Sequence, residues 1–106
     1  MKVMLLMWSD DSYSGGGDAA DYAAWAEFEQ VLRGDGVLTD SGHFAEPVDA
    51  RTVVTSISAE PDAALEPSPA LAGYYLLEVD GLDTASAYAR RAPLYGTVEV
   101  RPLVQY

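Results

Sequence analysis

His43 and Asp10 are the side chains in this sequence best placed for acid–base chemistry. His43 is the only histidine, and imidazole is the side chain most often used as a general base near neutral pH. Asp40 and Glu46 lie close to it in the sequence, so a carboxylate can orient its ring. Asp10 is followed by a second aspartate, and burial of the pair would raise the proton affinity of one of them. Each candidate also has a non-catalytic interpretation. His43 can simply be an exposed side chain, and Asp10 and the aspartate after it can be solvated charges in a loop.

Four side chains are candidates for lining a ligand pocket: Trp8, Tyr13, His43 and Tyr75. Trp8 and Tyr13 flank the point where the first predicted strand leaves the sheet, and side chains there can reach a cleft between the sheet and its helices. Such a cleft would suit a small, uncharged or cationic, partly aromatic molecule. A second histidine and cysteines are lacking, and the carboxylates do not have the spacing of metal ligands. We therefore expect no metal and no cofactor.

Length and charge narrow the possible partners. A chain of 106 residues is predicted to form a single domain, 1–106, around one hydrophobic core. Its formal net charge is −11, from 17 acidic and 6 basic residues, and such a surface repels phosphate backbones and anionic lipids. We therefore expect neither nucleic acid nor a membrane as partner. The absence of cysteine excludes disulfides and thiolate nucleophiles.

The opening apolar run, Lys2–Trp8, is too short for the hydrophobic region of a signal peptide. It stops at Ser9-Asp10-Asp11, and no cleavage site follows. Apolar runs long enough to cross a membrane are also lacking. These features predict a cytoplasmic protein.

Six segments have the periodicity of strands or helices. The first is apolar on both of its faces, so it must be covered on both. The second helix is expected to begin at Asp83, a good capping residue, to carry Arg90 and Arg91 in its last turn, and to end before Pro93. Val37–Thr39 and His43–Phe44 are weaker, short extended pieces. In chain order the six segments are strand Lys2–Trp8, helix Asp18–Arg33, strand Thr52–Ile57, strand Gly73–Val79, the helix from Asp83 and strand Thr97–Arg101.

This order predicts an α+β, ferredoxin-like βαββαβ fold. Right-handed crossovers place the first and third strands in the centre of a four-stranded antiparallel sheet. The two helices cover only one face of that sheet, so the other face needs a partner. A second copy of the chain is the simplest one, which predicts a homodimer through the sheet face.

Three segments carry a resemblance to a known family. They are Met4-Leu5-Leu6 in the first strand, Gly73 to Val79 followed by Leu82-Asp83, and the closing Val98 to Leu103. These segments are similar to the YCII-related superfamily, and more closely to its DGPF-domain (DGPFAETKE-like) branch. The resemblance covers most of the chain in order, and it implies a dimeric α+β barrel.

The residues that the resemblance associates with activity are missing. Enzyme-like members pair a histidine on the first helix with an aspartate just before a Pro-Tyr near the end of the second helix. Here the helix Asp18–Arg33 has no histidine, and Ala92 stands where the aspartate is expected. The Asp-Gly-Pro-Phe tetrad of the closer branch is also absent around Pro61–Ala64.

The sequence therefore favours a small-molecule-binding dimeric barrel without the superfamily's His–Asp pair. One alternative is an enzyme of the lyase, isomerase or dehydrohalogenase type that uses His43 or Asp10 as general base. A second alternative is a non-catalytic interaction module that acts through its acidic surface.

Overall fold

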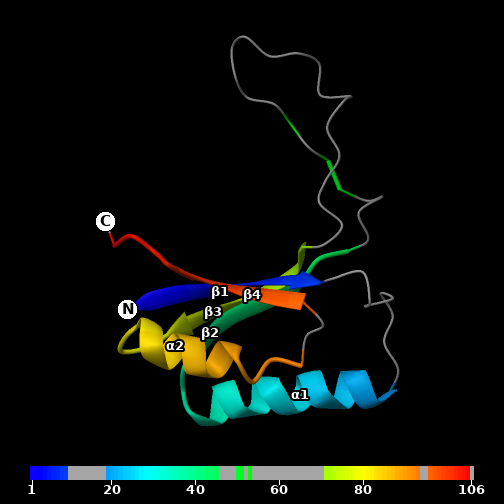
Figure 1. The fold of residues 1–106 in the computed structure, drawn as a ribbon, viewed down its shortest axis with the longest axis horizontal. Helices are drawn as coiled ribbons and strands as arrows, with labels where there is room; N and C mark the ends of the chain where they lie inside the picture. The colour runs from blue at the N-terminus through cyan, green and yellow to red at the C-terminus, as the bar shows by residue number, and fades with distance from the viewer. Residues whose placement is uncertain (10–18, 46–49, 52, 54–70, 94–95, 106) are drawn as a thin grey trace.

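The structure, a computed structural model, describes residues 1–9, 19–45, 50–51, 53, 71–93 and 96–105. Within these ranges no helix is long and apolar enough to cross a membrane. The elements follow the order βαββαβ (Figure 1). They are β1 (Lys2–Ser9), α1 (Ala19–Gly34), β2 (Leu38–His43), β3 (Leu71–Glu78), α2 (Leu82–Ala89) and β4 (Gly96–Pro102).

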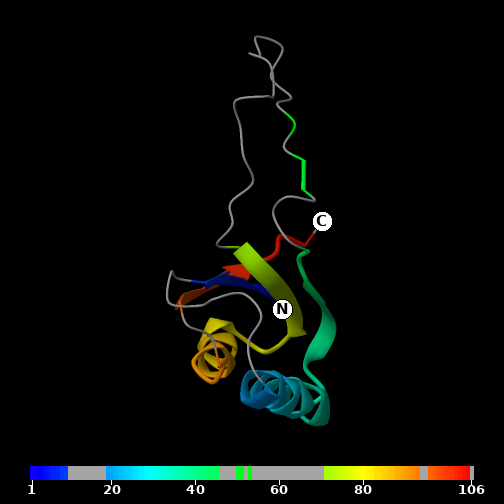
Figure 2. The same cartoon turned by 90° about the vertical axis from the view of Figure 1, so that its right-hand side faces the viewer.

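The four strands form one antiparallel sheet in the order β2-β3-β1-β4. The first and third strands are therefore central, as the ferredoxin-like arrangement requires. Both helices lie on the same side of the sheet, with α1 near β2 and α2 beneath β1 and β4 (Figures 1 and 2). The predicted α+β fold class is confirmed, while the dimeric barrel stays a prediction.

The core lies between the sheet and the two helices. In β1, Val3, Leu5 and Met7 point towards the helices and are buried, because side chains alternate between the faces of a strand. Tyr75 and Leu77 of β3 also point towards the helices and are buried. The helices contribute buried side chains from one face each, namely Phe28, Leu32, Ala85 and Ala89.

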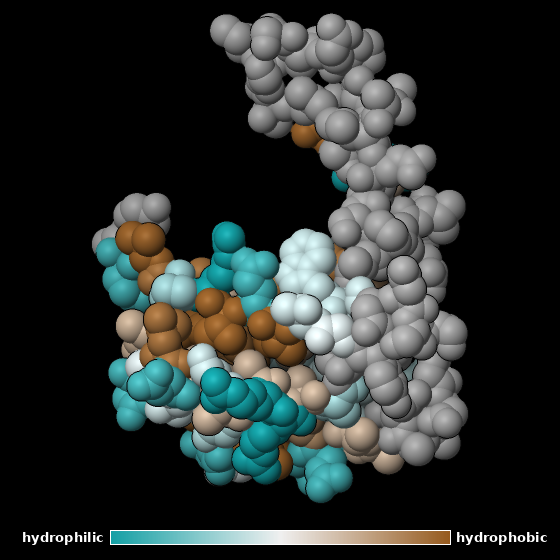
Figure 3. Space-filling view, in the orientation of Figure 1, coloured by the Kyte–Doolittle hydropathy of each residue, from teal (hydrophilic) through white to brown (hydrophobic). Residues whose placement is uncertain are grey.

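The opposite sheet face is called the open face below, and its central side chains are Met4, Leu6, Trp8, Tyr74 and Leu76. All five are half-buried in the single chain. Figure 3 shows apolar side chains at the level of the sheet, above hydrophilic side chains of the helical layer. The first strand is predicted to be apolar on both faces, and β1 has that character.

The second strand differs from the prediction. The strand that pairs with the outer side of β3 is Leu38–His43, which joins the two short pieces predicted separately. The predicted strand Thr52–Ile57 lies outside the described residues except for Val53, which belongs to no strand. A run as polar as Leu-Thr-Asp-Ser-Gly-His has little strand propensity of its own, so its pairing with β3 supplies most of the stabilisation.

The ends of the helices are only partly as expected. The residue before α2 is Gly81, and Asp83 lies in the first turn, where its charge suits the helix dipole without capping the helix. The helix ends at Ala89, so Arg90 and Arg91 follow it. α1 ends in a glycine turn: Gly36 has a positive φ of 72°, and the N–H of Val37 donates a hydrogen bond to the carbonyl of Leu32. Asp18, the first residue of this helix as predicted, lies outside the described residues.

Candidate functional site

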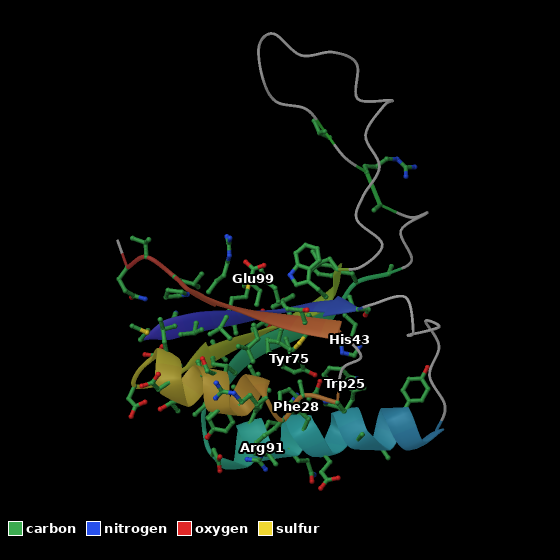
Figure 4. The ribbon with its side chains drawn as sticks, in the orientation of Figure 1. Trp25, Phe28, His43, Tyr75, Arg91 and Glu99 are labelled. Atoms are coloured by element: carbon green, nitrogen blue, oxygen red, sulfur yellow. The ribbon has the colours of Figure 1, made fainter. Side chains whose placement is uncertain are left out.

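Four aromatic side chains meet between α1 and the β2–β3 side of the sheet (Figure 4). Trp25 is stacked parallel to Tyr75, with ring centroids 6.2 Å apart and an interplanar angle of 8°. His43 stands edge-on to Trp25 at 6.1 Å. Phe28 stands edge-on to Tyr75 at 5.3 Å and to Trp25 at 5.8 Å. These four residues are called the aromatic cluster.

The local sequence explains why these rings meet. Trp25 and Phe28 are three residues apart on α1, which places them on the same side of the helix. In the sheet, His43 pairs with Gly73, and Tyr75 is on the same face two residues further along β3. A Cβ on Gly73 would lie 3.4 Å from Cδ2 of His43 and 2.5 Å from the carbonyl oxygen of Gly42. The glycine therefore provides the space for the imidazole and for close pairing of β2 with β3.

The inner end of the cluster is polar. The hydroxyl of Tyr75 donates a hydrogen bond of 2.9 Å to Oε1 of Glu29, and Oε2 of Glu29 lies 3.7 Å from Nη2 of Arg33. Burial, and then the hydrogen bond and charge of Glu29, raise the pKa of Tyr75 above its ordinary value, against a smaller opposing effect of Arg33. Tyr75 is therefore a neutral hydrogen-bond donor at physiological pH, which makes it unsuitable as a base.

The cluster runs from the core to the surface. Tyr75 is fully buried, Trp25 is half-buried and His43 is exposed. A planar molecule that reached this site would contact the indole and the imidazole first. The accessible end of the cluster thus offers an aromatic surface and one group able to accept a proton.

The structure brings together two of the four predicted pocket residues. His43 and Tyr75 share the helix-covered face and are linked through Trp25. Trp8 follows the inward-facing Met7, so it lies on the open face, away from His43 and Tyr75. Its indole Nε1 is buried without a hydrogen-bond partner among the described residues. Asp10 and Tyr13 lie outside the described residues.

Sequence reasoning did not assign Trp25 and Phe28 to the site. The helical spacing of Tyr22, Trp25 and Phe28 by itself predicts core packing for all three. Phe28 is indeed buried, but Trp25 is half-buried and Tyr22 is 67% exposed. The signal that could have identified Trp25 is its position between an exposed and a buried aromatic residue on the same helix.

Two hollows are found away from the aromatic cluster. One, of about 410 Å³, lies between α2 and β4. The other, of about 450 Å³, lies between α2 and Asp35 at the end of α1. Ala92, which stands where the resemblance leads one to expect an aspartate, lines the first hollow. In the described part of the chain, no three histidine or carboxylate side chains are grouped so that they could hold a metal ion.

Comparison with known proteins supports the fold alone. No protein-family model and no curated protein matches the sequence. Among solved structures, the chain is similar to 5-chloro-2-hydroxyhydroquinone dehydrochlorinase (TftG) from Burkholderia phenoliruptrix AC1100, in complex with 2,5-dihydroxybenzoquinone. The TM-score is 0.58 at 13% identity, over 100% of this chain and 96% of that chain. This likeness supports the ferredoxin-like α+β fold, while membership of the YCII-related superfamily and of its DGPF branch stays a prediction.

Proposed function

We propose that this chain is a small-molecule-binding dimeric α+β barrel protein whose ligand is a planar aromatic molecule held at the aromatic cluster. The observation that carries the proposal is the arrangement of Trp25, half-buried and parallel to Tyr75, with the exposed His43 at its edge. A ligand ring can stack on or stand against these rings, and each such contact contributes about 0.5–1.5 kcal/mol beyond its burial.

The charge around the cluster favours an uncharged or cationic ligand. Glu29 lies behind Tyr75, and the chain as a whole carries a net charge of −11. An aromatic cation would gain from both the carboxylate and the electron-rich faces of the rings. An anion would be repelled at long range, although salt screens this repulsion beyond about 8 Å at physiological ionic strength.

A titration with small aromatic probes tests the proposal. Tyramine, hydroquinone and 2,5-dihydroxybenzoquinone, the molecule bound in the TftG structure, represent a cation, a neutral phenol and a quinone. Two-dimensional NMR should show shifts of the Trp25 indole N–H signal on addition of at least one probe. Trp25→Ala, followed through the backbone amide signal of His43 in both proteins, should weaken that binding at least tenfold, because it removes the stacking surface.

The matched control is Tyr22→Ala. Tyr22 is an aromatic residue on the same helix, but it is 67% exposed and lies outside the cluster. Its removal should leave the affinity within about twofold of that of the parent. Equal losses in the two variants, or no response of the Trp25 signal to any probe, would contradict the proposal.

The second candidate is an enzyme of the dehydrohalogenase type, and the observation that favours it is the dehydrochlorinase activity named for TftG. In such a reaction a base removes a proton from the substrate, the carbon–halogen bond breaks, and a double bond forms as halide leaves. His43 is the described candidate for the base, because it is exposed beside Trp25.

Chloride release from 5-chloro-2-hydroxyhydroquinone measures this activity directly. If His43 is the base, His43→Gln should lower the rate by about 10²–10⁴-fold while the probes above still bind. Release that is unchanged in His43→Gln would exclude the histidine as base. A parent protein that binds aromatic probes and releases no chloride favours the binding protein.

A further inference from the structure

The hollow between α2 and β4 is separate from the aromatic cluster. It lies on the same face but at the opposite edge of the sheet, because β4 and β2 are the two edge strands. Its volume of about 410 Å³ falls in the range of small-molecule sites. We call it the α2–β4 hollow, and its lining residues are Ser86, Ala89, Arg90, Ala92, Gly96, Val98 and Val100.

Small side chains explain why this space is open. On the helix side the lining consists of the short side chains of Ser86, Ala89 and Ala92. On the strand side Val98 and Val100 are half-buried and face the helices, so they form an apolar floor. Alternation along β4 sends Glu99 to the other side of the sheet, where Figure 4 shows it above β4. None of the described residues that line the hollow is therefore a carboxylate.

Among the described residues, Arg90 is the one charged residue that lines the hollow. It follows the last residue of α2 and is exposed. None of the ion pairs in the described part of the chain involves its guanidinium. The carbonyl end of α2 disfavours an anion deep in the hollow. An anionic group would therefore sit at the mouth beside the guanidinium, with its apolar part directed inward over the valines.

We propose that the α2–β4 hollow binds a small monocarboxylate with a compact apolar body, its carboxylate on Arg90 and its body over Val98 and Val100. A guanidinium matches a carboxylate with two parallel hydrogen bonds. This site goes beyond the proposed function, because it lies at the other edge of the sheet and selects the opposite charge.

Benzoate is a suitable probe, with benzamide as its uncharged counterpart of the same shape. In two-dimensional NMR at physiological salt, benzoate should shift the backbone amide signals of Ser86 and Gly96, and benzamide should bind at least fivefold more weakly. Arg90→Gln should weaken benzoate binding at least fivefold. Arg91→Gln is the matched control: Arg91 is the next residue but lines the other hollow, so affinity should stay within twofold.

A second variant tests the location. Ala92→Leu fills the hollow with a longer apolar side chain and should abolish the shifts at Gly96 while leaving Arg90 in place. Trp25→Ala should leave benzoate binding unchanged, which separates this site from the aromatic cluster. Equal binding of benzoate and benzamide, equal losses in the two arginine variants, or unchanged binding in Ala92→Leu would each overturn the proposal.

Discussion

The hydroxyl of Tyr75, at the centre of the sheet, is hydrogen-bonded to the carboxylate of Glu29 on α1 at 2.9 Å. This bond fixes the position of the helix that carries Trp25 and Phe28 relative to the strand beneath them. Tyr75→Phe should lower the free energy of unfolding by about 1.5–3 kcal/mol, because it leaves a half-buried carboxylate without its donor. Urea unfolding at pH 7 measures this change. Tyr22→Phe, at an exposed position of the same helix, should have no measurable effect.

The same hydroxyl predicts a loss of stability at alkaline pH. Burial, followed by the hydrogen bond to and the charge of Glu29, raises the pKa of Tyr75 above the value of 10.0 for a free phenol. The unfolded chain therefore loses this proton first, and the stabilisation is complete below pH 10 and decreases above it. The slope for one such group is about 1.4 kcal/mol per pH unit. Tyr75→Phe should flatten the alkaline part of the stability profile.

Tyr88→Phe is the comparison for the alkaline profile. A hydrogen bond to Asp35, 2.6 Å long, is the main reason why the pKa of Tyr88 is also raised. The Tyr88 hydroxyl lies near the surface, where solvent screens its interaction with Asp35. Tyr88→Phe should therefore change the alkaline slope less than Tyr75→Phe does. If the slope of stability against pH above pH 10 is the same in the parent and in Tyr75→Phe, the alkaline loss of stability does not come from Tyr75.

The centre of the fold could be predicted from the sequence because its signals are local. The two apolar faces of β1, the aromatic and branched residues of β3 and the alternation of β4 each specify a strand without help from the rest of the chain. Gly36, with its positive φ, likewise ends α1 where the sequence placed the end. Such features depend on a few neighbouring residues.

The edge strand and the site could not be predicted in the same way. β2 is polar and contains Gly42, and it becomes a strand by pairing with β3. The meeting of His43 with Trp25 depends on that pairing and on the position of α1, both of which are contacts between residues far apart in the sequence. The placement of Trp8 on the open face followed from strand alternation and was available from the sequence.

Gly73→Ala should destabilise the protein by about 1–3 kcal/mol, the usual effect of overpacking a close contact. The added Cβ would lie 2.5 Å from the carbonyl oxygen of Gly42, so β2 and β3 would have to separate. Gly34→Ala is the control, since a Cβ there meets nothing within 4 Å. It should leave stability unchanged or raise it by up to about 1 kcal/mol. Thermal unfolding of both variants measures the difference, and similar midpoints would contradict the close packing at Gly73.

Homodimerisation through the open face predicts a specific effect of Leu6→Arg. Leu6 lies in the middle of β1 between Tyr74 and Glu99 of the neighbouring strands. In a single chain the new guanidinium can reach Glu99 and water, so the fold should persist. In a face-to-face dimer it would be buried against a second copy of itself, where two like charges cannot be accommodated.

Analytical ultracentrifugation at micromolar concentration distinguishes the monomer from the face-to-face dimer. The parent is expected to sediment at twice the chain mass of 11.4 kDa and Leu6→Arg at the chain mass. Tyr22→Arg adds the same charge to the exposed surface of α1 and should remain dimeric. Near-ultraviolet circular dichroism should be similar for the three proteins, which checks that the fold is kept. A parent that sediments as a monomer across the concentration range would refute the face-to-face dimer, because the apolar side chains of the open face would then be stable in water without a partner.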